Sequence, residues 1–153
     1  MIPRSDVIEY ARTLIGVPYR HMGRNGLGGR PGLDCAGPLV CICHRFGIPH
    51  RDHFGTYSEY PSGGKLERFL SRSLVPIGAD QIRPASVIVS RVWGPWGQSG
   101  EIAQHMAIVV AVEPRLRILH AADDDSIRRV AEHDARPQHA ENILCAFDFP
   151  GVG

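Results

Sequence analysis

The segment Gly32-Leu33-Asp34-Cys35-Ala36-Gly37-Pro38-Leu39 places a cysteine where a glycine-rich loop changes into a helical pattern. The first N–H groups of a helix are unpaired and carry the positive end of its dipole, so they lower the pKa of a nearby thiol. Pro38 fits only in the first turn, which makes Cys35 the expected cap residue. The same N–H groups are suited to hold an oxyanion. We therefore predict that Cys35 is a nucleophile; the alternative is a small buried side chain, the commonest role of a lone cysteine.

Helical patterns lie on both sides of this segment. Apolar residues recur at helical spacing in residues 5–15, and the glycine-rich loop 16–34 follows them. Helical spacing returns over residues 39–46, with Gly47 placed to end that helix. A further short helix is expected near residues 65–71.

The second half of the chain predicts a sheet. Short β-branched or alternating runs are separated by turn signals, and Glu113-Pro114-Arg115 has the composition of a hairpin turn. Helices followed by an antiparallel meander indicate an α+β fold, with the helices packed on one face of the sheet. We expect one domain spanning residues 1–153 and a sheet of about five strands at 86–92, 106–112, 116–121, 126–130 and 143–149.

Composition excludes several classes of protein. Hydrophobic residues make up 43% and charged residues 22% of the 153 residues, and the formal net charge of +1 gives no reason to expect a nucleic acid or an anionic membrane as partner. No apolar run reaches the roughly 20 residues of a membrane span. The N-terminus lacks the apolar core of a signal peptide, so we expect synthesis in a cytoplasm.

A second group of cysteines and histidines gives no convincing metal site. It comprises Cys41, Cys43, His44, His50 and His53, whose spacing does not converge on one point as zinc ligands do. The run Asp123-Asp124-Asp125 is expected to be a solvated turn. A framework of disulfides is not expected among the four cysteines of a cytoplasmic chain. We predict no metal and no organic cofactor.

A nucleophilic thiol needs a base, and the base needs a partner that orients it. Of the eight histidines, His105 opens the most apolar strand pattern and His120 ends the next one. If these strands form a hairpin centred on residue 113, both imidazoles meet at one end of the sheet. One imidazole can then take a proton while the other fixes its tautomer. The alternative for each is a hydrogen-bonded histidine at a strand end.

Four segments of the chain form a recognisable series: Gly16-Val17-Pro18-Tyr19-Arg20-His21-Met22-Gly23-Arg24, then Gly32-Leu33-Asp34-Cys35-Ala36-Gly37, then Gln104-His105-Met106-Ala107-Ile108-Val109-Val110, then Leu119-His120-Ala121. In this order they resemble the NlpC-type cell-wall cysteine peptidases, and within them the phage tail-associated branch. The resemblance covers nearly the whole chain. It departs from the family at Ala36, where serine is commoner, at Pro38, at Pro84-Ala85-Ser86 and in an extra loop over residues 93–100.

The resemblance implies a minimal papain-like fold, in which the helix bearing the nucleophile packs on an antiparallel sheet. It also implies hydrolysis of peptide amide bonds in bacterial peptidoglycan, often the D-γ-glutamyl–diaminopimelate bond. By position, Cys35 is the nucleophile, His105 the base and His120 the residue that orients it. Tyr19 is expected to line the substrate cleft or to assist the oxyanion.

We assign Asp34, Trp93 and Trp96 to the substrate site together with Tyr19. The expected partners are peptidoglycan stem peptides and phage tail-tip proteins, and the expected place of action is the cell wall, as part of a virion or injection device. Two alternatives stay open. One is a papain-like amidase or acyltransferase on a non-wall substrate, and the other is a structural tail-tip component with a vestigial site.

Overall fold

The computed structural model describes residues 1–52, 65–93, 102–122 and 127–153. Its helices are α1 (Arg4–Arg12), α2 (Gly37–Phe46), α3 (Lys65–Ser71) and the short α4 (Pro137–Ala140), with 3-10 turns at Leu27–Gly29 and Ala79–Gln81. Its strands are β1 (Val75–Ile77), β2 (Val87–Trp93), β3 (Ile102–Ala111), β4 (Arg117–Ala121), β5 (Val130–Asp134) and β6 (Ile143–Asp148).

All six strands form one antiparallel sheet in the order β1-β6-β2-β3-β4-β5. The α+β class is confirmed, and so is the hairpin between β3 and β4. The strand missing from the sequence prediction is β1, which is three residues long, has Pro76 at its centre and lies at the edge of the sheet. Proline is tolerated there because an edge strand leaves N–H groups unpaired.

The position of β5 was also predicted wrongly. The pattern at residues 126–130 was taken for a strand, whereas β5 covers Val130–Asp134. Arg128 has a positive φ of 44°, and Arg129 pairs with Pro18 outside the sheet. The true strand is polar at Glu132, and polar residues are common in strands that lie at an exposed edge.

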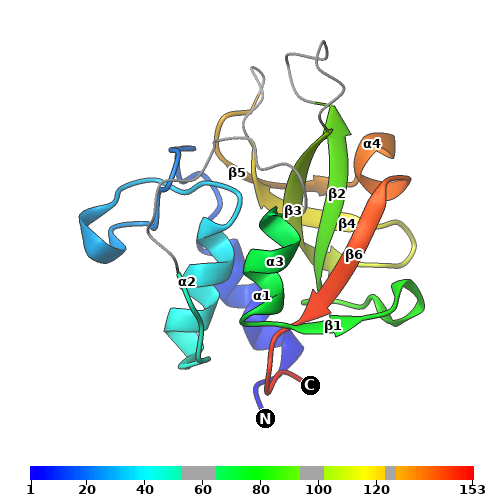
Figure 1. The fold of residues 1–153 in the computed structure, drawn as a ribbon, viewed down its shortest axis with the longest axis horizontal. Coiled ribbons are helices and arrows are strands. Elements are labelled where there is room, and N and C mark those ends of the chain that lie inside the picture. The colour runs from blue at the N-terminus through cyan, green and yellow to red at the C-terminus, as the bar shows by residue number, and fades with distance from the viewer. Residues whose placement is uncertain (53–64, 94–101, 123–126) are drawn as a thin grey trace.

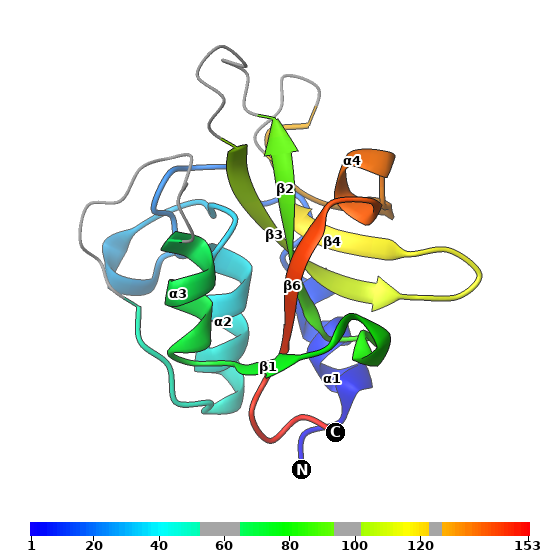
Figure 2. The same cartoon turned by 45° about the vertical axis from the view of Figure 1, so that its right-hand side comes forward.

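The helices α1, α2 and α3 gather on one side of the sheet, as expected, whereas α4 lies apart from them beside β2 (Figures 1 and 2). Alternation along β3 explains this layering. Met106 and Ile108 belong to the main core with the helices, whereas Ala107 and Val109 belong to a smaller apolar cluster. The helix α2 is buried along most of its length and ends at Gly47, whose φ of 65° requires a residue that tolerates the left-handed region.

The two ends of the chain meet. Ile2 forms a parallel bridge with Val152, and its N–H donates to the Gly151 carbonyl over 2.8 Å. Within the described ranges, no helix has the length and apolar character needed to cross a membrane.

Candidate active site

The Asp34 carboxylate organises the loop that carries Cys35. Oδ1 accepts hydrogen bonds from the N–H groups of Ala36 (3.1 Å) and Gly37 (2.9 Å), and Oδ2 accepts one from the N–H of Met22 (3.0 Å). The residue is only 2% exposed. Such a carboxylate holds the turn together. The substrate contact that we expected of Asp34 stays a prediction.

A buried arginine completes this arrangement. Arg24 has no solvent exposure, and its Nη1 donates to Asp34 Oδ1 (2.8 Å) and to the Gly23 carbonyl (2.8 Å). Its Nε and Nη2 bind both carboxylate oxygens of Asp52 at 2.8 and 3.1 Å. Sequence reasoning missed these roles of Arg24 and Asp52, because nothing in the sequence distinguishes Arg24 from Arg20 and Arg30 of the same loop.

The helix that follows Cys35 starts later than expected. Its first residue is Gly37 and its cap is Ala36, so Cys35 lies one residue outside the cap. The N–H groups of Ala36 and Gly37 already donate to Asp34, and Pro38 has no N–H. Residues 36–38 therefore offer the Cys35 thiolate no free N–H group, contrary to the expectation.

The pKa of the Cys35 thiol reflects this. Burial raises it to about 12, and the neighbouring Asp34 carboxylate raises it further, whereas a hydrogen bond from the Met106 peptide N–H and the charge of Arg24 act in the opposite direction. The prediction of a lowered pKa was wrong, first because the thiol is buried and second because the Asp34 carboxylate lies beside it. Cys35 is consequently a neutral thiol at rest, and it needs a base to become a nucleophile.

The contact with Met106 places the sulfur beside β3, next to the peptide that joins Met106 to His105. That His105 takes the thiol proton over a distance of about 4 Å stays a prediction. Cys35 as a whole residue is partly exposed, whereas burial of its thiol is the main cause of its raised pKa.

The predicted adjacency of the two histidines is confirmed. His105 lies within β3, which begins four residues earlier than expected, and its Nε2 is 2.7 Å from Nδ1 of His120. The pairing of Ile108 with Leu119 aligns the two strands so that both imidazoles project at the same end. His120 is 5% exposed, and His105 is partly buried.

A third histidine extends the contact. His120 Nε2 lies 2.7 Å from Nε2 of His133, which sits on β5 opposite Ile118. The Nδ1 of His133 lies 2.7 Å from the carbonyl oxygen of Asp134. Sequence reasoning missed His133 because β5 was placed four residues too early, which left this residue outside the predicted sheet.

The remaining predicted site residues are placed only in part. Tyr19 is partly buried and forms a bridge with Leu33, two residues before Cys35, while its N–H donates to the Arg128 carbonyl. Trp93 ends β2, but its side chain and the whole of Trp96 lie outside the described residues. A contact of these aromatic residues with substrate stays a prediction.

Other candidate sites are weaker. Cys41 and Cys43 are buried in the core, and His44 is exposed on α2. In the described part of the chain, no three histidine, cysteine, aspartate or glutamate side chains are arranged to hold a metal ion. The segment Asp123-Asp124-Asp125 and His53 fall outside it.

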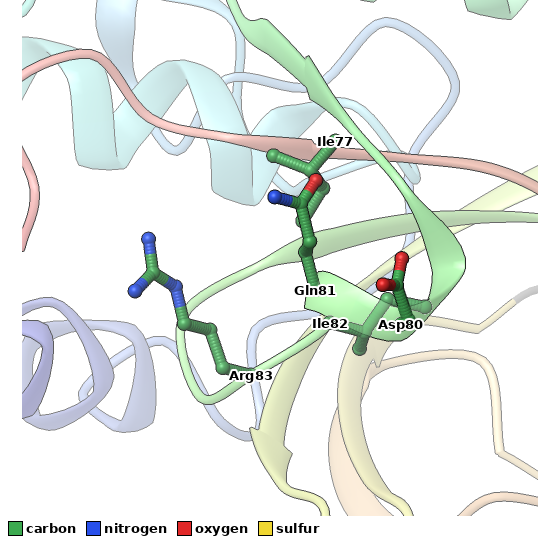
Figure 3. A pocket seen from close by; sticks show the side chains of 5 residues that line it. All are labelled: Ile77, Asp80, Gln81, Ile82 and Arg83. Carbon is green, nitrogen blue, oxygen red and sulfur yellow. The ribbon is translucent and has the colours of Figure 1, made fainter.

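A surface pocket lies near β1, away from Cys35. In Figure 3 the side chain of Gln81 points toward Ile77, and Arg83 points away from it. Gln81 Oε1 accepts a hydrogen bond from the N–H of Gly78, and Arg83 binds Asp148. Both of these lining side chains are thus engaged in local structure. The lining consists of Ile77, Asp80, Gln81, Ile82 and Arg83.

Comparison with known proteins supports the fold. The structure is similar to an NLP/P60 family protein described as similar to a lipoprotein from Staphylococcus aureus subsp. aureus Mu50, with a TM-score of 0.62 and 16% identity over 95% of this chain. It is also similar to an NlpC/P60 family protein from Bacillus cereus ATCC 10987, with a TM-score of 0.60 and 19% identity over 95% of this chain. The chain covers 41% and 40% of these two proteins. No family model and no curated protein matches the sequence. The chain thus has the fold of NlpC/P60 proteins.

Proposed function

We propose that the protein is a cysteine peptidase that hydrolyses peptide amide bonds of bacterial peptidoglycan. The observation that carries this proposal is the position of the Cys35 sulfur beside Met106 of β3, the strand whose His105 is paired with His120. The fold shared with NlpC/P60 proteins supports it. Because the thiol is neutral at rest, catalysis depends on transfer of its proton to His105.

The reaction is an acyl transfer in two stages. The Cys35 sulfur bonds to the amide carbonyl carbon while its proton passes to a ring nitrogen of His105. His105 then protonates the amine as the C–N bond breaks, which leaves a thioester. Water, losing a proton to His105, attacks the thioester; the products are a carboxylic acid and the free thiol. His120 orients His105 throughout.

The backbone at the nucleophile suggests where the oxyanion is held. Within residues 35–38, the N–H groups of Ala36 and Gly37 are committed to Asp34 and Pro38 has none, whereas the N–H of Cys35 lies against its own sulfur. We assign the Cys35 N–H as an oxyanion donor, because a donor in this position faces the carbonyl oxygen of an amide attacked by that sulfur. Tyr19 is a candidate for the second donor.

The finer assignments rest on the sequence motifs. We propose the D-γ-glutamyl–diaminopimelate bond as the bond that is cleaved, and action at the cell wall as part of a phage tail or related injection device. Stem peptides and tail-tip proteins are the corresponding partners.

A digest of purified sacculi tests the function. The parent protein should release fragments whose masses identify a new carboxyl group and a new amine at one peptide bond. Cys35→Ala should release none. Cys145→Ala is the matched control, because Cys145 is also partly exposed but lies on β6, and it should digest like the parent. Equal release by Cys35→Ala and the parent, or no release by the folded parent from any wall type, would contradict the proposal.

A further inference from the structure

We propose that His133 is a positioning residue that sets the tautomers of the two histidines before it and so delivers the basic nitrogen of His105 to Cys35. The inference rests on the proposed function for its catalytic meaning. The inference also predicts which ring nitrogen carries the proton in each of His105, His120 and His133, and this can be measured without any substrate.

His133, the last of the three rings, is held by a backbone carbonyl. A carbonyl oxygen only accepts hydrogen bonds, so the 2.7 Å contact between His133 Nδ1 and the Asp134 carbonyl requires a proton on Nδ1. In a neutral imidazole the other nitrogen is then an acceptor. Nε2 of His133 therefore accepts a hydrogen bond from Nε2–H of His120 across 2.7 Å.

The tautomer of His120 in turn determines that of His105. With its proton on Nε2, the Nδ1 of His120 is an acceptor, and the 2.7 Å contact with His105 requires a proton on Nε2 of His105. The lone pair of His105 is thus on Nδ1. A single backbone carbonyl fixes all three tautomers, and the outcome is a base at Nδ1 and a donor at Nε2 of the same ring.

This arrangement also suits the protonated state. When Nδ1 of His105 takes the thiol proton, Nε2–H keeps its hydrogen bond to His120, so no ring has to turn over. Without His133, His120 can instead carry its proton on Nδ1 and donate to Nε2 of His105. That state puts the His105 proton on Nδ1, where it blocks acceptance of the thiol proton.

The two carboxylates that flank His133 on β5 are bound to arginines. Glu132 binds Arg12 of α1 and Arg117 of β4. The carboxylate of Asp134 binds Arg117 and Arg115. Successive side chains of a strand point to opposite faces, so Glu132 and its arginines lie on the other face from His133.

The tautomers can be read directly by long-range nitrogen–proton NMR of the imidazoles in the full chain, at a pH where they are neutral. The parent should show Nε2–H at His105, Nε2–H at His120 and Nδ1–H at His133. In His133→Leu, the His105 signal should shift to a mixture of both tautomers. In His133→Gln it should resemble the parent, because a glutamine side-chain oxygen can accept from His120 as Nε2 does.

Turnover of wall peptide gives the second readout. For His133→Leu, kcat should fall by about 10-fold or more, within the roughly 10⁴-fold that a wrong tautomer can cost, with KM little changed. His133→Gln should recover most of the loss. Glu132→Gln is the matched control: it weakens the attachment of the same strand through Arg12 and Arg117 without touching an imidazole, and it should keep the parent tautomers and kcat well below its melting temperature.

A proton on Nδ1 of His105 in the parent, or parent-like His105 tautomers and kcat in folded His133→Leu, would overturn the inference. If the parent hydrolyses no wall but shows the three tautomers given above, the proposed function fails and the assignment of His133 as the residue that sets them stands.

Discussion

At the scale of single residues, the neutral thiol of Cys35 is the feature with the widest consequences. Burial and the Asp34 carboxylate raise its pKa to about 12, so the thiolate is scarce at neutral pH unless a base removes the proton. Reactivity at this site is therefore a property of the pair of Cys35 and His105, and not of the cysteine alone.

Alkylation measures this dependence. In the parent, Cys35 should react with iodoacetamide near neutral pH faster than the other cysteines, because the pKa values of Cys41, Cys43 and Cys145 are also raised by burial and these thiols have no imidazole partner in the contacts described. In His105→Asn the rate at Cys35 should fall roughly 100-fold. In this variant the alkylation rate at Cys35 should keep rising beyond pH 10, because the pKa of the thiol is raised. Peptide mass mapping follows each site, and equal rates in parent and variant would exclude His105 as the base.

The His120 variants separate an orienting residue from a base. His120→Asn and His120→Gln retain a hydrogen-bonding side chain, so both should keep more activity than His120→Ala, which can lose up to about 10⁴-fold. An amide cannot take up a proton, so His105→Asn should be less active than His120→Asn. Turnover of the four variants, each with a folded spectrum, tests both roles. Full activity of His120→Ala would contradict the orienting role of His120.

At the scale of elements, the strand pair β3–β4 was predictable and the neighbouring β5 was not. Alternation and the turn at Glu113-Pro114-Arg115 fix the hairpin, and the adjacency of His105 and His120 follows from it. His133 escaped because the polar residues of β5 carry little strand signal at an exposed edge. The loop before Cys35 escaped for a different reason: the buried contacts of Arg24 join segments far apart in sequence, and no local pattern encodes them.

The Asp34 network predicts a large effect on stability. Asp34→Ala removes the acceptor for the first N–H groups of α2 and leaves buried Arg24 with one carboxylate in place of two. Removing one partner of a buried ion pair costs about 3–5 kcal/mol of the free energy of unfolding. Denaturant unfolding should show this loss, whereas Asp80→Asn, at an exposed turn, should change little. A loss below 1 kcal/mol for Asp34→Ala would contradict the structural role given to this carboxylate.

At the scale of the whole molecule, one carboxylate joins the first helix to the last strand. Asp148 on β6 accepts hydrogen bonds from Arg4 of α1 at 2.7 Å, from Ser86 at 2.8 Å and from Arg83 at 3.0 Å. Burial acts to raise the pKa of Asp148, but these hydrogen bonds outweigh it and leave the pKa lowered. The ionised form is thus bound more strongly in the folded protein than in the unfolded chain.

This lowered pKa predicts a pH-dependent contribution to stability. It is fully present above the unfolded value of about 3.9 and is lost as the pH falls through the lower folded value. Asp148→Asn should therefore reduce the free energy of unfolding by about 1.5–3 kcal/mol at pH 7. The gap between parent and variant should close as the pH falls below 4, which urea unfolding across this range can measure. A gap independent of pH would exclude the charge of Asp148 as its origin.

The meeting of the two chain ends has a practical consequence for engineering. Ile2 is hydrogen-bonded to Gly151 and to the N–H of Gly153, and both ends lie on the side of the molecule away from the tip of β2 (Figure 1). Linkers attached to the N-terminus and to the C-terminus therefore start close to each other. The domain can therefore be spliced into a surface loop of a carrier protein, or closed into a ring by a short linker, without stretching its fold.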